Sequence, residues 1–318
     1  MKSRIVIGLF ILLILGSCFV EFHYKPRVET GRIVDIAGDT LICSAQITYT
    51  GNADIITSGF CWSKHSNPSM LDSVTVDGGI NGDYECAISG LVVGETYYFK
   101  AYATNYVGTS YGDVIHAKIY ETDSVYDIDG NVYKTVKIGD QWWMAENLRV
   151  THYNNGDEIN RFVYDRSGTE TPSIMYLRDD DSDANIYGAF YNWFAISDER
   201  GLAPEGWHVS SDEEWKELEI YIGMDSSAVD TTGWRGLNTG KLKSNEYNGT
   251  DVYGLNILPA GSAGTNRVYS NLWTSTLYNN NDYSAYVRSF SGSNTAIGRG
   301  HLMTTYGYSV RCIKDKPL

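Results

Sequence analysis

Aromatic and amide side chains alternate in the stretch VYSNLWTSTLYNNNDYSAYVRSFSGSN, residues 268–294. Aromatic faces stack on sugar rings and amides hydrogen-bond hydroxyl groups, so this composition suits ligand recognition on a loop held by a rigid scaffold. The candidate ligand-binding residues are Tyr269, Trp273, Tyr278, Asn279, Asn280, Asn281, Asp282 and Tyr283. The alternative is a tyrosine-rich strand and its turn, without a ligand.

Three aspartates at alternate positions, Asp179, Asp181 and Asp183, are a weak candidate for Ca²⁺ binding. An EF-hand loop beginning at Asp179 would need Gly at its sixth position and Glu at its twelfth. Ala184 and Phe190 stand there instead. A solvated acidic loop is therefore the favoured interpretation, and no other cofactor is expected.

Catalytic histidines and cysteines are not expected. His152, His208 and His301 are scattered, without the short spacing of metal ligands, which favours structural or surface roles. Cys312 lies in a predicted terminal strand, where a thiol more often packs than reacts. No Ser-His-Asp ordering, phosphate loop or dinucleotide motif is visible.

A pair of carboxylates is the remaining route to catalysis. Glu146 with Asp157 and Glu158 could serve a polysaccharide hydrolase, but nothing in the sequence sets the separation between them. Carboxylates are also plentiful in an acidic chain. We therefore expect a protein that is not an enzyme.

The elements that position these residues must be divided between about two domains. The chain has 318 residues, and single cores stop growing at roughly 250–300 residues. An aromatic content of 13%, with 32 Gly and only 6 Pro, favours many short strands and turns. The net charge of −14 repels nucleic-acid phosphates, so nucleic-acid binding is excluded.

The first residues, MKSRIVIGLFILLILGSC, have the pattern of a secretory signal. Lys2 and Arg4 precede a short apolar run that ends in small residues, and this run is too short to span a bilayer comfortably. The sequence LGSC resembles the lipobox of bacterial lipoproteins. That resemblance implies a signal peptide at residues 1–17, acyl chains on Cys18 and a tether at 18–27, in a protein bound to the outer membrane of a Gram-negative bacterium. The alternative is an uncleaved signal anchor.

Residues 28–121 show short runs with period-two alternation, such as DTLICSAQITY, split by Gly, Asn and Asp. This pattern predicts an antiparallel β-sandwich. Cys43, Cys61 and Cys86 fall in it, and Cys43 and Cys86 share the inward parity of their strands. Buried thiols are expected, with a Cys43–Cys86 disulfide as the alternative.

The segments GFCWSKHSNP and ISGLVVGETYYFKAYATNYVGTSYG, in this order, resemble the fibronectin type III-like domains of Bacteroidetes surface proteins. Leu91 begins the stretch that matches the Leu-x-Pro-Gly-Thr-x-Tyr corner of that family, with Val93 in place of Pro. The resemblance implies that Leu91 plugs one end of the sandwich, and that Tyr97 or Tyr98 caps the corner with a hydroxyl hydrogen bond.

A second domain is expected at residues 125–315. VYKTVKI and QWWMA flank Gly139-Asp140, which predicts a hairpin with a two-residue turn. Trp143 shares the apolar parity of this hairpin and is expected in the core. Trp142 points the other way and is expected to be covered by later elements.

Two helices are predicted before a final set of strands. In YGAFYNWFAIS, the residues Ala189, Trp193 and Ile196 recur at helical spacing. Ser211 and Glu214 form a capping box, followed by an apolar stripe of Trp215, Leu218 and Ile222. From Gly233 to Lys314 short strands return, so the domain is predicted to be α+β.

This half of the chain is identified as resembling the Fibrobacter succinogenes major paralogous domain. The matching segments, in order, are DIDGNVYKTVKIGDQWWMAENLRVTHYNNGDEI, YGAFYNWFA, APEGWHVSSDEEWKELE, GLNILPAG, LWTST and YGYSVRCIKD. Its GWHVSSDEEW and GYSVRC patterns are similar to signatures of C-type-lectin-like and formylglycine-generating-enzyme-like domains. The resemblance implies that fold by analogy, and no activity is implied for the family as a class.

These expectations combine into one functional hypothesis. A lipid-anchored, non-catalytic envelope protein would use its sandwich as a spacer and its lectin-like domain to bind a glycan or a surface protein. The alternatives are a polysaccharide hydrolase with an unrecognised carboxylate pair and a structural or assembly subunit of a surface appendage.

Overall fold

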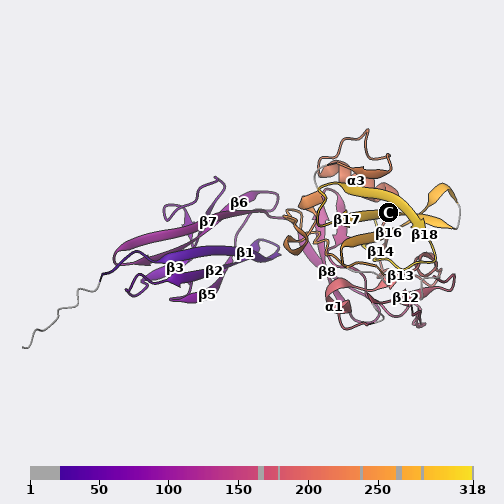
Figure 1. Cartoon of the computed structure of the whole chain (residues 1–318), viewed down its shortest axis with the longest axis horizontal. Coiled ribbons are helices and arrows are strands. Elements are labelled where there is room, and N and C mark those ends of the chain that lie inside the picture. The colour runs from indigo at the N-terminus through magenta and orange to yellow at the C-terminus, as the bar shows by residue number, and fades with distance from the viewer. Residues whose placement is uncertain are drawn as a thin grey trace, which may run out of the picture.

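The chain forms two β-rich domains in series along its long axis (Figure 1). The computed structural model describes residues 22–163, 168–177, 180–236, 239–262, 267–280 and 283–316. Within these ranges the helices are few and short, so the protein is mostly β with several antiparallel sheets. No helix in the described part of the chain is long and apolar enough to cross a membrane.

The first domain is a sandwich of two antiparallel sheets, with strand orders β1-β2-β5 and β4-β3-β6-β7. Its strands are β1 (Arg27–Ala37), β2 (Thr40–Tyr49), β3 (Thr57–Ser63), β4 (Ser73–Val74), β5 (Gly82–Ile88), β6 (Thr96–Asn105) and β7 (Gly108–Lys118). The alternation predicted for β2 is confirmed, because Leu41, Cys43, Ala45 and Ile47 are all buried in the core between the sheets.

The corner predicted near Leu91 is present. Leu91 is buried, and the backbone N–H of Val92 donates a hydrogen bond of 3.2 Å to the hydroxyl oxygen of Tyr97. Tyr97, rather than Tyr98, therefore caps this end of the sandwich.

The cysteines of the sandwich are unpaired and buried, as expected. Cys43 and Cys86 are direct partners across β2 and β5. Burial raises the pKa of the Cys86 thiol to about 11, and it also raises the pKa of Cys43. Such thiols pack as small hydrophobic groups and react poorly.

The second domain contains three sheets. Their orders are β14-β19-β10-β9-β8, β15-β18-β17-β16 and β11-β12-β13. The strands are β8 (Thr122–Tyr126), β9 (Val132–Ile138), β10 (Gln141–Met144), β11 (Asn160–Arg161), β12 (Ser173–Met175), β13 (Phe190–Tyr191), β14 (Trp207–Val209), β15 (Gly233–Arg235), β16 (Tyr269–Leu277), β17 (Ser284–Ser291), β18 (Ile297–Met303) and β19 (Cys312–Lys314). The helices are α1 (Ala184–Tyr187), α2 (Trp193–Ile196), α3 (Asp212–Tyr221) and the 3₁₀ turns η2 (Thr239–Lys241), η3 (Asn245–Tyr247) and η4 (Tyr278–Asn280).

The junction between the domains is short and packed. β8 already pairs with β9 from Thr122 onward, three residues before the predicted start of the second domain. Tyr120 packs against the cores of both domains. Its ring fills the space beside Gly254, where a Cβ atom would lie 2.2 Å from it. The sandwich is therefore joined to the second domain by packed side chains rather than by a free linker.

The two predicted helices have different outcomes. The capping box of Ser211 and Glu214 is formed, and Trp215, Leu218 and Ile222 are buried, so α3 is confirmed. The helix predicted over residues 187–197 is wrong for its first half. Phe190 and Tyr191 form β13, and helical structure begins only after Asn192, whose side chain caps α2. Pairing of β13 with β12 overrides the helical spacing, because strand partners supply backbone hydrogen bonds there.

The hairpin of β9 and β10 holds the two adjacent tryptophans. Trp143 is fully buried and lies 4.8 Å, centroid to centroid, from Trp215. Trp142 is only half-buried, with the Lys314 ammonium 5.9 Å from its ring centroid. The core prediction for Trp143 is confirmed, whereas Trp142 is covered less than expected.

The imidazole of His208 lies between two carboxylates. Its Nε2 is 2.8 Å from Glu214 and its Nδ1 is 2.6 Å from Asp315. The hydrogen bond with Glu214 raises the pKa of His208, burial partly opposes this rise, and Asp315 adds to it. The imidazole of His208 therefore ties Asp315, the residue after β19, to the first turn of α3, and its protonation strengthens both contacts.

This arrangement predicts a pH-dependent stability. Because the folded pKa is raised, the contribution of His208 is complete below its unfolded pKa of about 6.5 and is lost as the pH rises through the folded value. The side chain is 42% exposed, so we expect a loss of at most about 1 kcal/mol. Urea unfolding below and above this range, compared between the wild type and His208→Gln, measures it. Equal slopes for the two proteins would contradict the assignment.

Candidate functional site

The predicted aromatic stretch folds into the hairpin of β16 and β17, whose tip carries a cluster of rings. Tyr278 stacks on His301 with centroids 3.7 Å apart and an interplanar angle of 9°. Tyr286 meets Tyr278 edge-on at 5.4 Å. Asn279 and Tyr283 are exposed beside them, Tyr283 at 80%. We call these five residues, Tyr278, Asn279, Tyr283, Tyr286 and His301, the hairpin-tip surface.

The hairpin-tip surface lies at the end of the molecule that is remote from the sandwich. β18 runs away from the sandwich (Figure 1), and its last residue, Met303, pairs with Ser284 at the start of β17. Leu277, at the end of β16, pairs with the next residue of β17. The tip is therefore the part of this sheet farthest from the sandwich (Figure 1).

Trp273 does not belong to this surface, so its assignment as a ligand-binding residue is corrected. It is fully buried, and its indole N–H donates a 2.8 Å hydrogen bond to the backbone oxygen of Tyr191. Its ring also meets Tyr308 edge-on at 5.0 Å. Trp273 is a core residue at the base of the hairpin.

Tyr269 is exposed but stands apart from the tip. It begins β16, whereas Tyr278 follows the end of that strand. Nine residue steps separate the two tyrosines, about 30 Å along an extended strand, so one small ligand cannot contact both rings. The remaining predicted positions are only partly described: the structure covers neither the Asn280 side chain nor Asn281 and Asp282.

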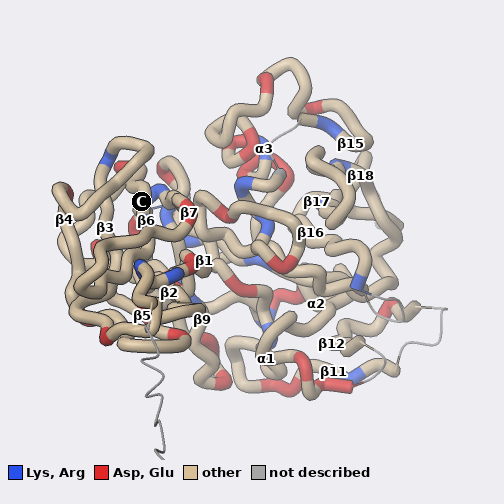
Figure 2. Tube along the Cα trace, turned by 60° about the vertical axis from the view of Figure 1, so that its left-hand side comes forward, with Lys and Arg blue, Asp and Glu red and all other residues tan. Residues whose placement is uncertain are grey.

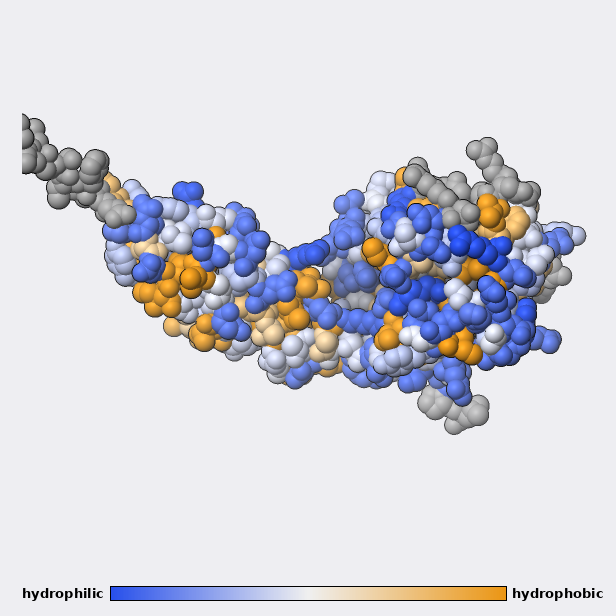
Figure 3. Space-filling view, turned by 90° about the horizontal axis from the view of Figure 1, so that it is seen from below, coloured by the Kyte–Doolittle hydropathy of each residue, from blue (hydrophilic) through white to orange (hydrophobic). Residues whose placement is uncertain are grey.

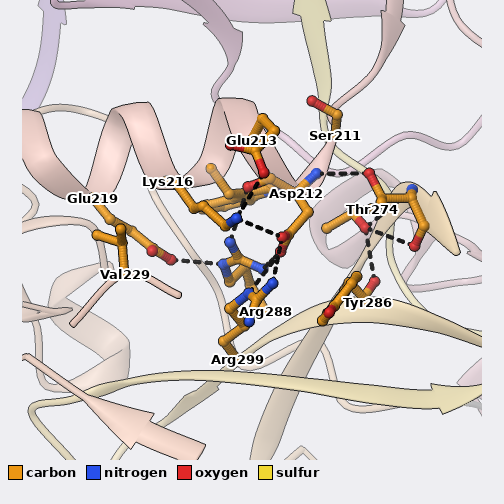
Figure 4. Close-up of polar contacts among 12 residues, drawn as sticks. Ser211, Asp212, Glu213, Lys216, Glu219, Val229, Thr274, Tyr286, Arg288 and Arg299 are labelled. Carbon is orange, nitrogen blue, oxygen red and sulfur yellow. Dashed lines mark hydrogen bonds and ion pairs between the residues drawn. The ribbon is translucent and has the colours of Figure 1, made fainter. Parts of the chain in front are cut away.

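A buried network of charges lies between α3 and the strands of the hairpin's sheet (Figure 4). Asp212, at the start of α3, accepts hydrogen bonds of 2.7 Å from Arg288 and of 2.6 and 3.0 Å from Arg299. Glu219, on the same face of α3, accepts 2.6 Å and 2.7 Å bonds from Arg288 and Arg235. Together these contacts tie α3 to β15, β17 and β18.

This network reaches the hairpin-tip surface through Arg299. Its guanidinium carbon lies 4.2 Å from the ring centroid of Tyr286. Burial acts to raise the pKa of Asp212, but hydrogen bonds from Arg299 and the charge of Arg288 outweigh it and bring the pKa to about 2. Asp212 is therefore ionised at neutral pH, and its charge holds in place the arginine under Tyr286.

The acidic loop does not gather its carboxylates into a Ca²⁺ site within the described residues. Asp181 pairs with Arg161 at 3.3 Å, and Asp183 pairs with Arg267. Acidic residues border the molecule near α1 (Figure 2), yet these two face cations from different segments. Asp179 lies outside the described residues. Across the described ranges, no group of three or more His, Cys, Asp or Glu residues is arranged to hold a metal ion.

The other catalytic candidates have structural surroundings. His152 pairs with Asp129 at 2.6 Å, and Cys312 is fully buried, with a pKa raised by that burial. Asp157 pairs with Arg200 at 3.1 Å. His301 is exposed and belongs to the hairpin-tip surface through its stack on Tyr278.

Glu146 lies in a cleft of about 490 Å³ between the two domains. The second domain contributes Asp251 and Ser244 to the same cleft, and the sandwich contributes Asp35. Burial raises the pKa of Asp251 to about 8, and Asp251 has a positive φ of 42°. Ser244 is buried, and its hydroxyl has no hydrogen-bond partner within the described part of the chain.

The two regions differ in what they can do. The hairpin-tip surface offers exposed rings and an amide on a braced hairpin, which suits stacking against a sugar or a protein side chain. The cleft offers the carboxyl groups of Glu146 and Asp251, which is the kind of pair that acid–base chemistry requires. Sequence reasoning named His301 only for a structural or surface role and did not single out Tyr286 or Asp251. The alternation of Ser284, Tyr286 and Arg288 along β17 was a usable signal for Tyr286, whereas nothing local marked Asp251.

The proposed acylation site, Cys18, lies outside the described residues, as do residues 1–21 as a whole.

Comparison with known proteins gives a family and little else. No curated protein matches the chain. A solved structure of the twitchin kinase region from C. elegans matches with 14% sequence identity and a TM-score of 0.22, covering 54% of this chain and 28% of that one. A TM-score this low supports no conclusion about fold or function. The model of the Fibrobacter succinogenes major domain matches residues 136–314, which is more than half of the chain and includes both the hairpin-tip surface and the buried charge network. The chain therefore belongs to the Fibrobacter succinogenes major domain family.

Proposed function

We propose that this protein is a lipid-anchored envelope protein that binds a glycan or protein ligand outside the cytoplasm and does not catalyse a reaction. The observation that carries the proposal is the hairpin-tip surface, where exposed aromatic and amide groups stand on a braced hairpin at the end remote from the N-terminus. The LGSC sequence supports the anchor on Cys18. An outer-membrane location in a Gram-negative bacterium belongs to the same proposal.

The finer fold assignments are part of the proposal. The strand orders β1-β2-β5 and β4-β3-β6-β7, with the Tyr97 corner, support a fibronectin type III-like sandwich that serves as a spacer. The GWHVSSDEEW and GYSVRC segments support a C-type-lectin-like second domain. The second assignment rests on analogy with known signatures.

Two properties make the hairpin-tip surface suitable for binding. Tyr278 and His301 hold one another in a parallel stack, so their orientation is set before a ligand arrives. Tyr283 exposes most of its ring, and an exposed tyrosine offers both a stacking face and a hydroxyl. Neutral glycans or protein surfaces suit this region better than nucleic acid, because the chain is acidic overall.

Binding is expected to depend on Tyr283. Tyr283→Ala should weaken ligand binding by about tenfold or more, because stacking on an aromatic ring contributes roughly 0.5–1.5 kcal/mol beyond the buried area of the ring itself. A glycan array with residues 19–318 identifies the ligand, and titration of that ligand measures the change. Tyr269→Ala is the matched control, since Tyr269 is exposed on the same sheet but away from the tip.

Three outcomes would contradict parts of this proposal. Equal loss for both variants would contradict binding at the hairpin tip. Capture of a protein component of a surface appendage, with no glycan bound, would favour an assembly subunit. For the anchor, globomycin or Cys18→Ala should block processing, so that a precursor which keeps residues 1–17 accumulates; processing that neither treatment changes would refute it.

A polysaccharide hydrolase is the second candidate, because Glu146 and Asp251 both line the interdomain cleft. A carboxyl with a pKa near 8 is protonated at neutral pH and could act as a general acid. Glu146, however, is held by the Arg149 guanidinium at 3.0 Å and by the backbone N–H of Lys134 at 2.8 Å. This pairing suits a structural carboxylate, so binding is preferred. Turnover of a polysaccharide that is abolished by Asp251→Asn would reverse the preference.

A further inference from the structure

Three segments of the sandwich meet at the end where the chain begins. They are residues 22–26 before β1, residues 50–56 between β2 and β3, and the turn at 106–107 between β6 and β7. The backbone N–H of Tyr24 donates a 2.8 Å hydrogen bond to the oxygen of Gly51. The Asn105 side chain donates a 2.6 Å hydrogen bond to the oxygen of Tyr24, which fastens the third segment.

The approach of these segments is close. A Cβ atom at position 51 would lie 2.0 Å from the oxygen of Tyr24, and Gly51 has a φ of 81°. Both facts require glycine there. Asn52 also binds the backbone oxygen of Phe22 at 3.2 Å. The segment that leads into β1 is therefore fastened to the sandwich from Phe22 onward.

This end of the sandwich exposes large apolar side chains from all three segments. The exposed fractions are 65% for Phe22, 54% for Tyr24, 67% for Ile56, 65% for Tyr106 and 39% for Val107. We call these five residues the tether-end surface. In Figure 3 the hydrophobic residues of this face lie mainly along the middle of the sandwich and toward the second domain, so the tether-end surface is defined by the exposed fractions of its residues. Such a concentration on one end of a domain marks a contact surface.

Cationic side chains lie beside the tether-end surface. Lys25 and Arg27 are exposed in the segment that leads into β1, and His23 contacts Tyr106 edge-on at 5.3 Å. Asp54, in the connection between β2 and β3, is the nearby exposed acid. Among the described residues beside this surface the two cations outnumber this one acid, while Glu21, directly before Phe22 in the sequence, lies outside the described residues.

We propose that the tether-end surface rests in the headgroup layer of a phospholipid bilayer. The inference depends on the proposed acylation of Cys18, because only four residue steps separate that residue from Phe22. Even a fully extended chain of that length spans at most about 14 Å. The headgroup region is about 5–8 Å deep on each side of the hydrocarbon, so this end of the sandwich cannot move far from it.

The composition of the surface suits that environment. Tyrosine is enriched where hydrocarbon meets headgroups, because its ring is apolar and its hydroxyl remains hydrated. Phe22, Ile56 and Val107 supply apolar area, while Lys25 and Arg27 suit anionic phospholipids. The long axis of the molecule would then point away from the membrane, with the hairpin-tip surface at its outer end (Figure 1).

The test uses the full chain, processed by a bacterial host and reconstituted in vesicles of phosphatidylethanolamine and phosphatidylglycerol. An environment-sensitive fluorophore is attached to Tyr106→Cys or, separately, to Ile56→Cys. The cysteines in the described part of the chain are buried, so the new thiol is the reactive one. Leu71→Cys is the matched control, because Leu71 is 97% exposed and follows β3 at the opposite end of the sandwich from Ile56.

Both tether-end labels are expected to shift their emission to shorter wavelength in vesicles and to lose quenching by a water-soluble quencher, while the Leu71 label changes in neither respect. Tether-end labels that behave like the control would overturn the inference. The mass of the N-terminal peptide separates the two proposals. If Cys18 is acylated but the labels remain exposed to water, only the bilayer contact is overturned. If Cys18 is unmodified, both the lipid anchor and the bilayer contact are overturned.

Discussion

Asp212→Asn is expected to lower the free energy of unfolding of the second domain by about 3–5 kcal/mol, because the change removes one charge from a buried network. In the wild type, Asp212 and Glu219 face Arg235, Arg288 and Arg299, and all five side chains are at most 6% exposed. Asparagine keeps the shape of the side chain but not its charge. Three buried guanidinium groups would then face Glu219 alone.

The measurement is urea unfolding followed by tryptophan fluorescence, which reports mainly on the second domain because every tryptophan except Trp62 lies there. Asp230→Asn is the matched control. Asp230 pairs with Lys216 at 2.6 Å at the rim of the same network, but its side chain is 76% exposed. Exposed pairs contribute about 0–1 kcal/mol. If the two variants unfold at the same urea concentration, the buried network does not stabilise the domain.

The pH dependence of the free energy of unfolding provides a second test of the same network. The folded pKa of Asp212 is about 2, below its ordinary value near 3.8, so its contribution is present at neutral pH. That contribution is lost as the pH falls through the lowered value. Wild type should therefore lose more stability than Asp212→Asn between about pH 4 and pH 2.

Trp273→Ala is expected to destabilise the second domain by about 3–5 kcal/mol, as is typical when a large buried aromatic side chain is truncated. The indole is fully buried, and its loss would also remove one of the two hydrogen bonds that the backbone oxygen of Tyr191 accepts; the other comes from the backbone N–H of Tyr308. Thermal or urea unfolding measures the effect. Tyr283→Ala, on the same hairpin but 80% exposed, should change stability by less than about 0.5 kcal/mol.

The pair of variants separates a core role from a binding role. Tyr283→Ala should lose ligand binding and keep its stability, while Trp273→Phe should keep ligand binding because Trp273 has no exposed surface to offer. If Trp273→Phe instead loses ligand binding while its unfolding curve stays unchanged, Trp273 belongs to the ligand-binding site and its role is not confined to the core.

Much of the fold was predictable from local patterns. The alternation in β2 and the capping box at Ser211 each depend on residues close together in the chain, and both are formed. The turn at Gly139 is formed for the same reason: its φ of 63° lies in the left-handed region, which glycine adopts without strain. Patterns of this kind work when the nearest neighbours decide the backbone conformation.

Local patterns failed where distant segments compete with them. Ala189, Trp193 and Ile196 have helical spacing, but Phe190 and Tyr191 between them pair with β12 instead. Trp273 and Tyr283 have similar surroundings in the sequence, yet one is buried and the other is exposed. The packing that distinguishes them comes from Tyr191 and Tyr308, which lie far away in the chain.

Residue spacing, composition and motif order were enough to predict two domains, the strands of the sandwich, the start of α3 and the family of the second domain. Three features became visible only in the folded protein: which rings of the aromatic stretch reach the surface, the link from these rings through Arg299 to Asp212, and the cleft that Glu146 and Asp251 line together. The physical reason is that exposure, ion pairing and clefts depend on which distant segments meet, and meetings between distant segments leave no local periodicity in the sequence.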